Sequence, residues 1–273
     1  MAAMCARIEY RNAERNMIKL ENVSLDIYGA KRRILSGINW HIRPGENWIL
    51  FGRNGSGKTK LLEVVTGYMF PTEGEVYRFG EGHLGHDIRD TRTGIGYASS
   101  ALGARFTMSE TILDTVLGGI YASIGLYDEP SPGDVGRARE LIAEAGLAGR
   151  EHDMMGHLSD GEKQKVMMLR ALIGDPGLLV FDEPAAGLDI VAREDLLDSI
   201  RTVAGSRSIA CVYVTHHVEE IIPLFDRIFI IDNGSCFFSG TVGEAVEKDV
   251  LSKVFGRGIE VFGRNGRLHS SVV

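Results

Sequence analysis

The stretch GRNGSGKT at residues 52–59 constrains the fold more strongly than any other part of the chain. It follows the apolar run WILF and opens a helix-like segment, GKTKLLEVVTGYM. Glycines between a buried strand and a helix let backbone N–H groups surround phosphate oxygens, and the pattern G-x-x-x-x-G-K-[ST] is typical of such loops. An ordinary glycine-rich turn is the alternative, and the strand–loop–helix setting argues against it. The sequence therefore predicts a phosphate-binding loop.

Lys58 and Thr59 give this loop its expected chemistry. The lysine can reach the β- and γ-phosphates of a nucleotide, and the threonine hydroxyl can bind Mg²⁺. Lys60 stands where a small hydroxyl residue is more usual. It either adds positive charge near the phosphates or points to solvent, and the sequence leaves both open. The loop residues that we expect around the phosphates are Gly52, Asn54, Gly55, Ser56 and Gly57.

A second acidic signal follows the apolar run LLVF, which ends in Asp182, Glu183 and a proline. An acidic residue at the end of a buried strand, beside a phosphate loop, is placed to hold Mg²⁺, so Asp182 is a predicted metal ligand. Glu183 can accept a proton from an attacking water. A surface turn rich in Asp, Glu and Pro is the alternative, which the phosphate loop upstream weakens.

Residues 158–162, LSDGE, open another predicted helix. The first N–H groups of a helix have no intrahelical partners and its dipole is positive there, so this is a second place suited to an anion. Ser159 or Asp160 can also cap the helix. The two roles are compatible because both use the same N–H groups.

The order of the predicted elements gives the architecture. Residues 18–51 contain short β-rich runs broken by turn residues. After residue 158, helices alternate with apolar runs that are typical of parallel strands buried on both faces. Between these parts lie two helical patterns, SETILDTVLGGIYASIG and DVGRARELIAEAGL. We expect an α/β fold with a mostly parallel sheet flanked by helices, an N-terminal antiparallel β part and a helical insert.

These patterns place a single domain over residues 18–240, with the helical insert at about 100–157. The runs DRIFIIDNG and SCFFSG predict a closing hairpin. We expect residues 241–273 to form a short C-terminal helix, over 242–255, and a tail. Residues 1–17 are an N-terminal extension without a readable signal.

Composition and charge argue against several classes of protein. A net charge of −7 gives no basic field for nucleic acid, so we expect no nucleic-acid partner. No apolar run approaches the ~20 residues of a membrane helix, and the N-terminus has no signal-peptide core. The three cysteines have no metal spacing and indicate reduced thiols rather than a disulfide framework. We expect a soluble cytoplasmic chain.

Four motifs together resemble the ABC-type (ATP-binding cassette) ATPase family: GRNGSGKT, LSDGE just before LLVFDEP, GLD at 187–189 and VTHH at 214–217. Their order and spacing fit, and LSDGE is similar to the family pattern LSGGQ. The resemblance covers about residues 18–240. It implies a P-loop NTPase core, ATP and Mg²⁺ as cofactors, and Mg-dependent hydrolysis of ATP to ADP and phosphate.

In that family two cassettes face each other head to tail, and the signature of one closes over the γ-phosphate held by the other. The resemblance therefore implies that Ser159 and Gly161 bind the ATP of a partner subunit. Asp189 would contact the facing subunit and couple the two sites. With one cassette in the chain, the implied working unit is a dimer, here a homodimer.

The resemblance assigns two more roles. His216 matches the histidine that contacts the γ-phosphate, so the expected catalytic residues are Glu183, His216 and Lys58. The alternative is that HHVEE forms a metal cluster, although adjacent histidines at a strand end point in divergent directions and no third ligand is evident. Tyr28 stands where the family stacks an aromatic ring on adenine; a strand tyrosine reflecting β-propensity alone is the alternative.

One position departs from the family pattern. In the family, the corresponding strand usually ends in a glutamine that contacts Mg²⁺ and the attacking water. Here the strand ends at Ser99 and is followed by Ser100, and Ser100 (or Ser99) stands in place of the glutamine. Serine is shorter and reaches a metal only through a water, so Ser100 is the weakest metal candidate beside Thr59 and Asp182. The same serine, the run SIGLY and the stretch THHVEE are similar to cassettes related to the tandem ABC protein associated with molybdate transport.

The resemblance implies the ATP-binding and ATP-hydrolysing subunit of an ABC importer, peripheral on the cytoplasmic face of the membrane. Its membrane contact would run only through integral-membrane permease subunits. The apolar run TVLGGIYASIGLY is either a docking face for them or a helix side packed in the insert. The alternative function is a soluble ABC ATPase without a permease, acting in regulation or on a macromolecule, which Ser100 favours.

Overall fold

Three sheets organise the part of the chain that the computed structural model describes, residues 17–27, 32–82, 88–99, 102, 109–207, 209–264 and 266–273. The largest has six strands in the order β10-β9-β3-β8-β7-β6. Its neighbouring strands are parallel except for β9 and β10, so the mostly parallel sheet and its closing hairpin are confirmed. The strands are β3 (Asn47–Phe51), β6 (Ile95–Ser99), β7 (Leu178–Asp182), β8 (Ala210–Thr215), β9 (Arg227–Asp232) and β10 (Ser235–Thr241).

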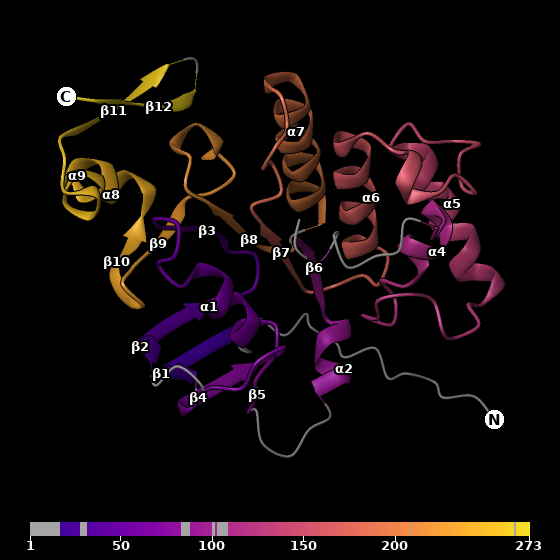
Figure 1. Cartoon of the computed structure of the whole chain (residues 1–273), viewed down its shortest axis with the longest axis horizontal. Coiled ribbons are helices and arrows are strands. Elements are labelled where there is room, and N and C mark those ends of the chain that lie inside the picture. The colour runs from indigo at the N-terminus through magenta and orange to yellow at the C-terminus, as the bar shows by residue number, and fades with distance from the viewer. Residues whose placement is uncertain are drawn as a thin grey trace.

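The second sheet is the expected N-terminal antiparallel part. Its strand order is β2-β1-β4-β5, and each neighbouring pair is antiparallel. It lies below the parallel sheet in Figure 1 and encloses α1 (Lys58–Val65) between the two sheets. The strands are β1 (Ile18–Ile27), β2 (Arg32–Ile42), β4 (Glu73–Arg78) and β5 (Glu81–Gly82).

The alternation of side chains along the parallel strands divides the core into two layers. In β3, Ile49 and Phe51 face one layer and their neighbours face the other. The first layer is covered by α6 (Asp160–Leu172) and α7 (Ile190–Arg207), and the second by α1 and the antiparallel sheet (Figure 1). Because both faces are covered, these strands are apolar at almost every position, as continuous apolar runs in a sequence predict.

The helical insert packs on α6 through an apolar cluster of its own. It contains α4 (Ile112–Leu117), α5 (Pro132–Glu144) and a 3-10 turn, η1 (Met155–His157). The prediction of a long first helix is wrong beyond α4. Gly118 ends that helix, and Gly119 lies so close to α6 that a Cβ would collide with a backbone carbonyl oxygen of that helix. A short helix, α2 (Ile88–Thr93), precedes β6.

The C-terminal residues differ from the expected helix and tail. Two helices, α8 (Val242–Glu247) and α9 (Val250–Phe255), replace the single helix. Asp249 between them has a φ of 51°, and this left-handed conformation interrupts the helix. The expected tail forms a third, two-stranded sheet. This C-terminal hairpin consists of β11 (Ile259–Arg264) and β12 (Arg267–Val272).

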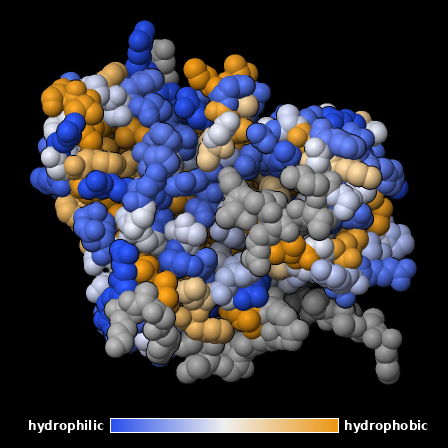
Figure 2. Space-filling view, viewed as in Figure 1, coloured by the Kyte–Doolittle hydropathy of each residue, from blue (hydrophilic) through white to orange (hydrophobic). Residues whose placement is uncertain are grey.

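The visible surface is mostly hydrophilic, and its apolar residues form small separate groups (Figure 2). None of the described helices has the length and apolar character that crossing a membrane requires.

Gly96 in β6 provides a test of how tightly the sheet and α6 are packed. A Cβ at this position would collide with the carbonyl oxygen of Ala171 in α6 and lie 2.8 Å from a methyl group of Leu179. We expect Gly96→Ala to lower the free energy of unfolding by about 1–3 kcal/mol, because a backbone carbonyl cannot move aside cheaply. Urea unfolding measures this change.

The matched control is Gly136→Ala. Gly136 is an exposed residue within α5, and a Cβ there has no heavy atom within 4 Å. Alanine should stabilise the helix by about 0.5–1 kcal/mol. Equal stabilities of the two variants would contradict the close packing of β6 on α6.

Candidate functional site

The predicted phosphate loop connects β3 to α1, and its glycines are required by its geometry. Gly55 and Gly57 have φ values of 79° and 111°, which residues with a side chain rarely adopt. A Cβ at Gly52 would collide with the carbonyl oxygen of Ile231 and lie 2.8 Å from the Ser56 hydroxyl oxygen. The loop therefore depends on glycine at three positions, twice for the backbone conformation and once for space.

The N-terminus of α1 suits an anion. Gly57 is its N-cap and supplies no side-chain cap, and its first turn contains no acidic residue. By contrast, α4, α5, α6 and α8 are each capped by a serine or threonine side chain. The hydroxyl of Ser56 is also buried without a hydrogen-bond partner among the described residues. The free N–H groups, the helix dipole and Lys58 together make a donor set that fits nucleotide phosphates.

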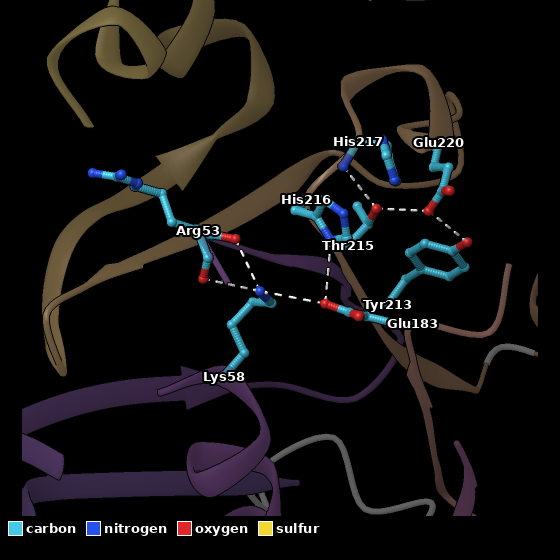
Figure 3. Close-up of polar contacts among 9 residues, drawn as sticks. Arg53, Lys58, Glu183, Tyr213, Thr215, His216, His217 and Glu220 are labelled. Carbon is cyan, nitrogen blue, oxygen red and sulfur yellow. Dashed lines mark hydrogen bonds and ion pairs between the residues drawn. The ribbon is translucent and has the colours of Figure 1, made fainter. Parts of the chain in front are cut away.

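Lys58 is buried under the loop, where its charge is held by oxygen atoms (Figure 3). Its Nζ donates to the backbone carbonyls of Gly52, at 2.9 Å, and Arg53, at 3.2 Å. It also lies 3.3 Å from Oε1 of Glu183. Lys60, by contrast, lies 2.6 Å from Glu63 in the same helix, so its charge is paired within α1.

Glu183 and His216 meet Lys58 from two neighbouring strands. Glu183 directly follows β7, and His216 directly follows β8. The His216 Nδ1 lies 3.3 Å from the same Glu183 oxygen that faces Lys58 (Figure 3). Glu183 has a φ of 47°, a conformation that costs a residue with a long side chain and is concentrated at functional sites. The structure thus brings the expected catalytic residues together.

Asp182 is buried at the end of β7, beside Ser99 at the end of β6. Its burial raises the pKa of the carboxyl group to about 6. The Tyr97 hydroxyl donates to Oδ2 of Asp182 at 3.2 Å, a contact that sequence reasoning missed. A buried carboxylate next to a phosphate loop fits a divalent cation, which would offset its desolvation cost. Asp182 and the exposed Thr59 are the described residues that would hold Mg²⁺.

Three further residues were candidates for nucleotide or metal binding: Tyr28, Ser100 and Ser99. Tyr28 and Ser100 lie outside the described residues. The Ser99 hydroxyl accepts a hydrogen bond from the backbone N–H of Leu102 at 2.9 Å, so its oxygen already binds a residue that follows β6. Within the described ranges, no group of three or more His, Cys, Asp and Glu side chains is arranged to hold a metal ion.

LSDGE begins α6, and Ser159 is its N-cap. The Ser159 hydroxyl accepts from the backbone N–H of Glu162 at 3.3 Å, and the Glu162 carboxylate accepts from the Ser159 N–H at 2.8 Å. Arg150 of the insert forms an ion pair with Glu162. Together these donors, Arg150 first, lower the pKa of Glu162 to about 2. The carboxylate at the start of this helix therefore stays ionised, and a cation beside it balances its charge.

Gly161 and Asp189 lie near each other at the start of α6 and α7. A Cβ at Gly161 would be 3.7 Å from the Ala192 side chain, and the Ala192 N–H donates to Asp189 Oδ1 at 2.9 Å. Asp189 is exposed and precedes α7 directly. The signature helix, α6, begins with LSDGE, and the phosphate-loop helix, α1, follows the phosphate loop. The two helices cover opposite faces of the parallel sheet (Figure 1).

A second group that the sequence did not reveal lies behind His216. The buried carboxylate of Glu220 accepts from the Tyr213 hydroxyl at 3.1 Å and the Thr215 hydroxyl at 2.6 Å (Figure 3). The Thr215 oxygen accepts from the His217 N–H at 2.9 Å. The alternation in VYVT, which places two hydroxyl groups on one face of a buried strand, was the available signal.

Comparison with known proteins adds independent evidence. The family model described as ABC transporter matches residues 35–186. The ABC transporter ATP-binding protein YlmA of Bacillus subtilis (strain 168) is 40% identical over 92% of this chain and 95% of its own length. The phosphonates import ATP-binding protein PhnC of Treponema denticola is 32% identical over 87% of this chain and 94% of its own.

Two further matches agree. The ABC transporter ATP-binding protein ModF of Escherichia coli (strain K12) is 32% identical over 69% of this chain and 39% of its own length. Among solved structures, a dimeric post-hydrolysis state of the ATP-binding cassette MJ0796 bound to ADP and Pi has a TM-score of 0.72 and 25% identity, over 83% of this chain and 99% of its own. The chain belongs to the ABC transporter family, as one of its ATP-binding proteins.

Proposed function

We propose that the chain hydrolyses ATP with Mg²⁺ and supplies the energy of an ABC importer. The observation that carries this proposal is the meeting of Lys58, Glu183 and His216 at one point between the phosphate loop and the ends of β7 and β8. A carboxylate in contact with both a lysine and an imidazole, beside a phosphate loop, provides groups that phosphoryl transfer to water uses.

Each residue has a separate role in this reaction. Glu183 accepts a proton from water as the water oxygen attacks the γ-phosphorus, and the bond from that phosphorus to the β–γ bridging oxygen breaks. ADP and phosphate are the products. Lys58 stabilises the negative charge on the phosphate oxygens, and His216 orients the water and the γ-phosphate. Mg²⁺, held by Asp182 and Thr59, would neutralise charge on the β- and γ-phosphates.

Glu183→Gln tests the role of the base. We expect ATP binding to persist and turnover to fall by about 10²–10⁴, because the amide cannot take the proton. A fluorescent ATP analogue measures binding, and phosphate release measures turnover. Glu129→Gln, at an exposed carboxylate of the insert, is the control and should behave as wild type. Turnover of Glu183→Gln within about tenfold of wild type would refute the assignment.

We further propose that two copies bind head to tail, each signature closing over the ATP in the other copy's phosphate loop. Three observations support this arrangement. The signature and phosphate-loop helices cover opposite faces of the sheet within one chain. Ser159 is exposed at the start of α6, where Arg150 and Lys163 form ion pairs with the two acidic residues of the first turn. The related cassette MJ0796 forms a dimer.

Two substitutions of Ser159 separate capping from phosphate binding. Ser159→Asp keeps an acceptor for the Glu162 N–H but loses the hydroxyl that donates to the Glu162 carboxylate at 2.9 Å, so it should cost about as much stability as Ser159→Ala while it repels phosphate and abolishes the ATP-dependent dimer. Ser159→Ala should lose about 1 kcal/mol of unfolding free energy and keep more of the dimer. Size-exclusion chromatography with ATP, in the Glu183→Gln background, measures dimer formation. A normal dimer in Ser159→Asp would leave Ser159 as a helix cap only.

The transport role rests on the family and on relatives such as PhnC, which is named as an import ATP-binding protein. In this proposal the chain lies on the cytoplasmic face of the membrane and touches it only through integral-membrane permease subunits. A soluble ABC ATPase without a permease is the second candidate, which the serine at position 100 favours.

A pull-down of tagged Glu183→Gln protein from its native host, in gentle detergent with ATP present, distinguishes these functions. We expect a polytopic membrane protein to co-purify in a fixed ratio. Omitting ATP gives the control for binding that depends on the closed dimer. Recovery of a soluble dimer alone, from a chain whose wild type hydrolyses ATP, would contradict the transporter role and support the soluble one.

A further inference from the structure

The C-terminal hairpin contacts the segment that carries His216. This segment continues from β8 into a single 3-10 turn, η2 (Val218–Glu220), and β12 packs against that turn. Apolar side chains of the hairpin anchor it on the core layer that α6 and α7 cover. They are Ile259, Val261 and Leu268.

Two adjacent carboxylates of η2 point to opposite sides. Glu220 is buried and binds the hydroxyl groups of Tyr213 and Thr215 in β8. Glu219 faces the hairpin, where its Oε1 accepts from the backbone N–H of Ser270 at 3.2 Å and from the Ser270 hydroxyl at 3.1 Å. The segment after His216 is therefore held from inside by β8 and from outside by β12.

The hairpin also binds α7. Arg267, at the start of β12, forms an ion pair with Glu194 in the first turns of α7. Asp189, the residue expected to contact a facing subunit, directly precedes this helix. The same hairpin thus contacts the two elements that follow the predicted site residues His216 and Asp189.

A single 3-10 turn has poor hydrogen-bond geometry and cannot fix its own position. Bonds from a serine N–H and hydroxyl to one ionised carboxylate are charge-assisted and directional, so they restrict the turn in a way that apolar packing does not. His216 is held by its backbone, by its contact with Glu183 at 3.3 Å and by the neighbouring His217 ring, whose centroid lies 4.1 Å from its own. Its position consequently depends on where η2 lies.

We propose that the C-terminal hairpin positions His216 for hydrolysis, and that the contact between Ser270 and Glu219 fixes this position. Ser270 and Glu219 are positioning residues, since neither contacts the nucleotide site. The inference rests on the proposed ATPase function and on the proposed role of His216. It predicts that loosening the contact lowers the rate of the chemical step and leaves ATP binding intact, because a displacement of about 1 Å can cost roughly 10²-fold in rate.

Three variants test this inference. Glu219→Ala removes both bonds to Ser270 and should lower kcat by roughly ten- to hundredfold with an unchanged KM for ATP. Ser270→Ala keeps the backbone bond and should have a smaller effect. Glu219→Gln retains an acceptor oxygen and should restore most of the rate. Ser271→Ala, at the exposed neighbouring position of β12, is the matched control.

Thermal unfolding of each variant separates positioning from loss of fold, since rescue by Glu219→Gln at equal melting temperature requires the acceptor itself. A wild-type chain that lacks ATPase activity, or whose activity survives Glu183→Gln, would overturn the proposed function and this inference with it. An active wild type whose kcat is unchanged by Glu219→Ala would overturn this inference alone.

Discussion

Parallel pairing of β3, β7 and β8 determines where the predicted catalytic residues lie. The register aligns Phe51 with Thr215 and Asp182 with Val214, so all three strands end at the same edge of the sheet. The phosphate loop, Glu183 and His216 are the next residues of these strands. Strands that ran in opposite directions would separate these groups by the length of the sheet, whereas parallel strands collect them at one edge.

At this edge of the sheet, polar partners offset the cost of burying charged groups. Lys58 contacts two backbone carbonyls and a carboxylate, and Asp182 has the Tyr97 hydroxyl as a donor. At the start of α6, nearer the surface, Arg150 likewise balances the charge of Glu162. Polar partners thus accompany each charged group, and this permits a site of mixed charge inside a chain that carries a net charge of −7.

The sequence could predict the parts of this protein whose pattern is local. The apolar runs WILF and LLVF lie within β3 and β7, because strands buried on both faces are almost uniformly apolar. Of the predicted catalytic residues, Lys58 was read from the phosphate-loop motif and Glu183 from the strand end before it, whereas His216 was read from the resemblance to the ABC family. The contact of Tyr97 with Asp182 and that of Ser270 with Glu219 were not readable, since they join residues 85 and 51 positions apart. Neither the bend at Asp249 nor the register of the C-terminal hairpin has a local signature.

Glu183 has a left-handed backbone conformation, so a substitution there can change two things, the conformational energy of the backbone and the chemistry of the side chain. Glutamine keeps the shape and the conformational energy of the original residue, so a change in rate reports the loss of the carboxylate and not a change in backbone strain. Glycine or asparagine would relax the backbone by of order 1 kcal/mol while removing the carboxylate, and such a variant could gain stability as it loses activity. The conformation at this residue therefore couples the stability of the chain to the direction of the Glu183 side chain.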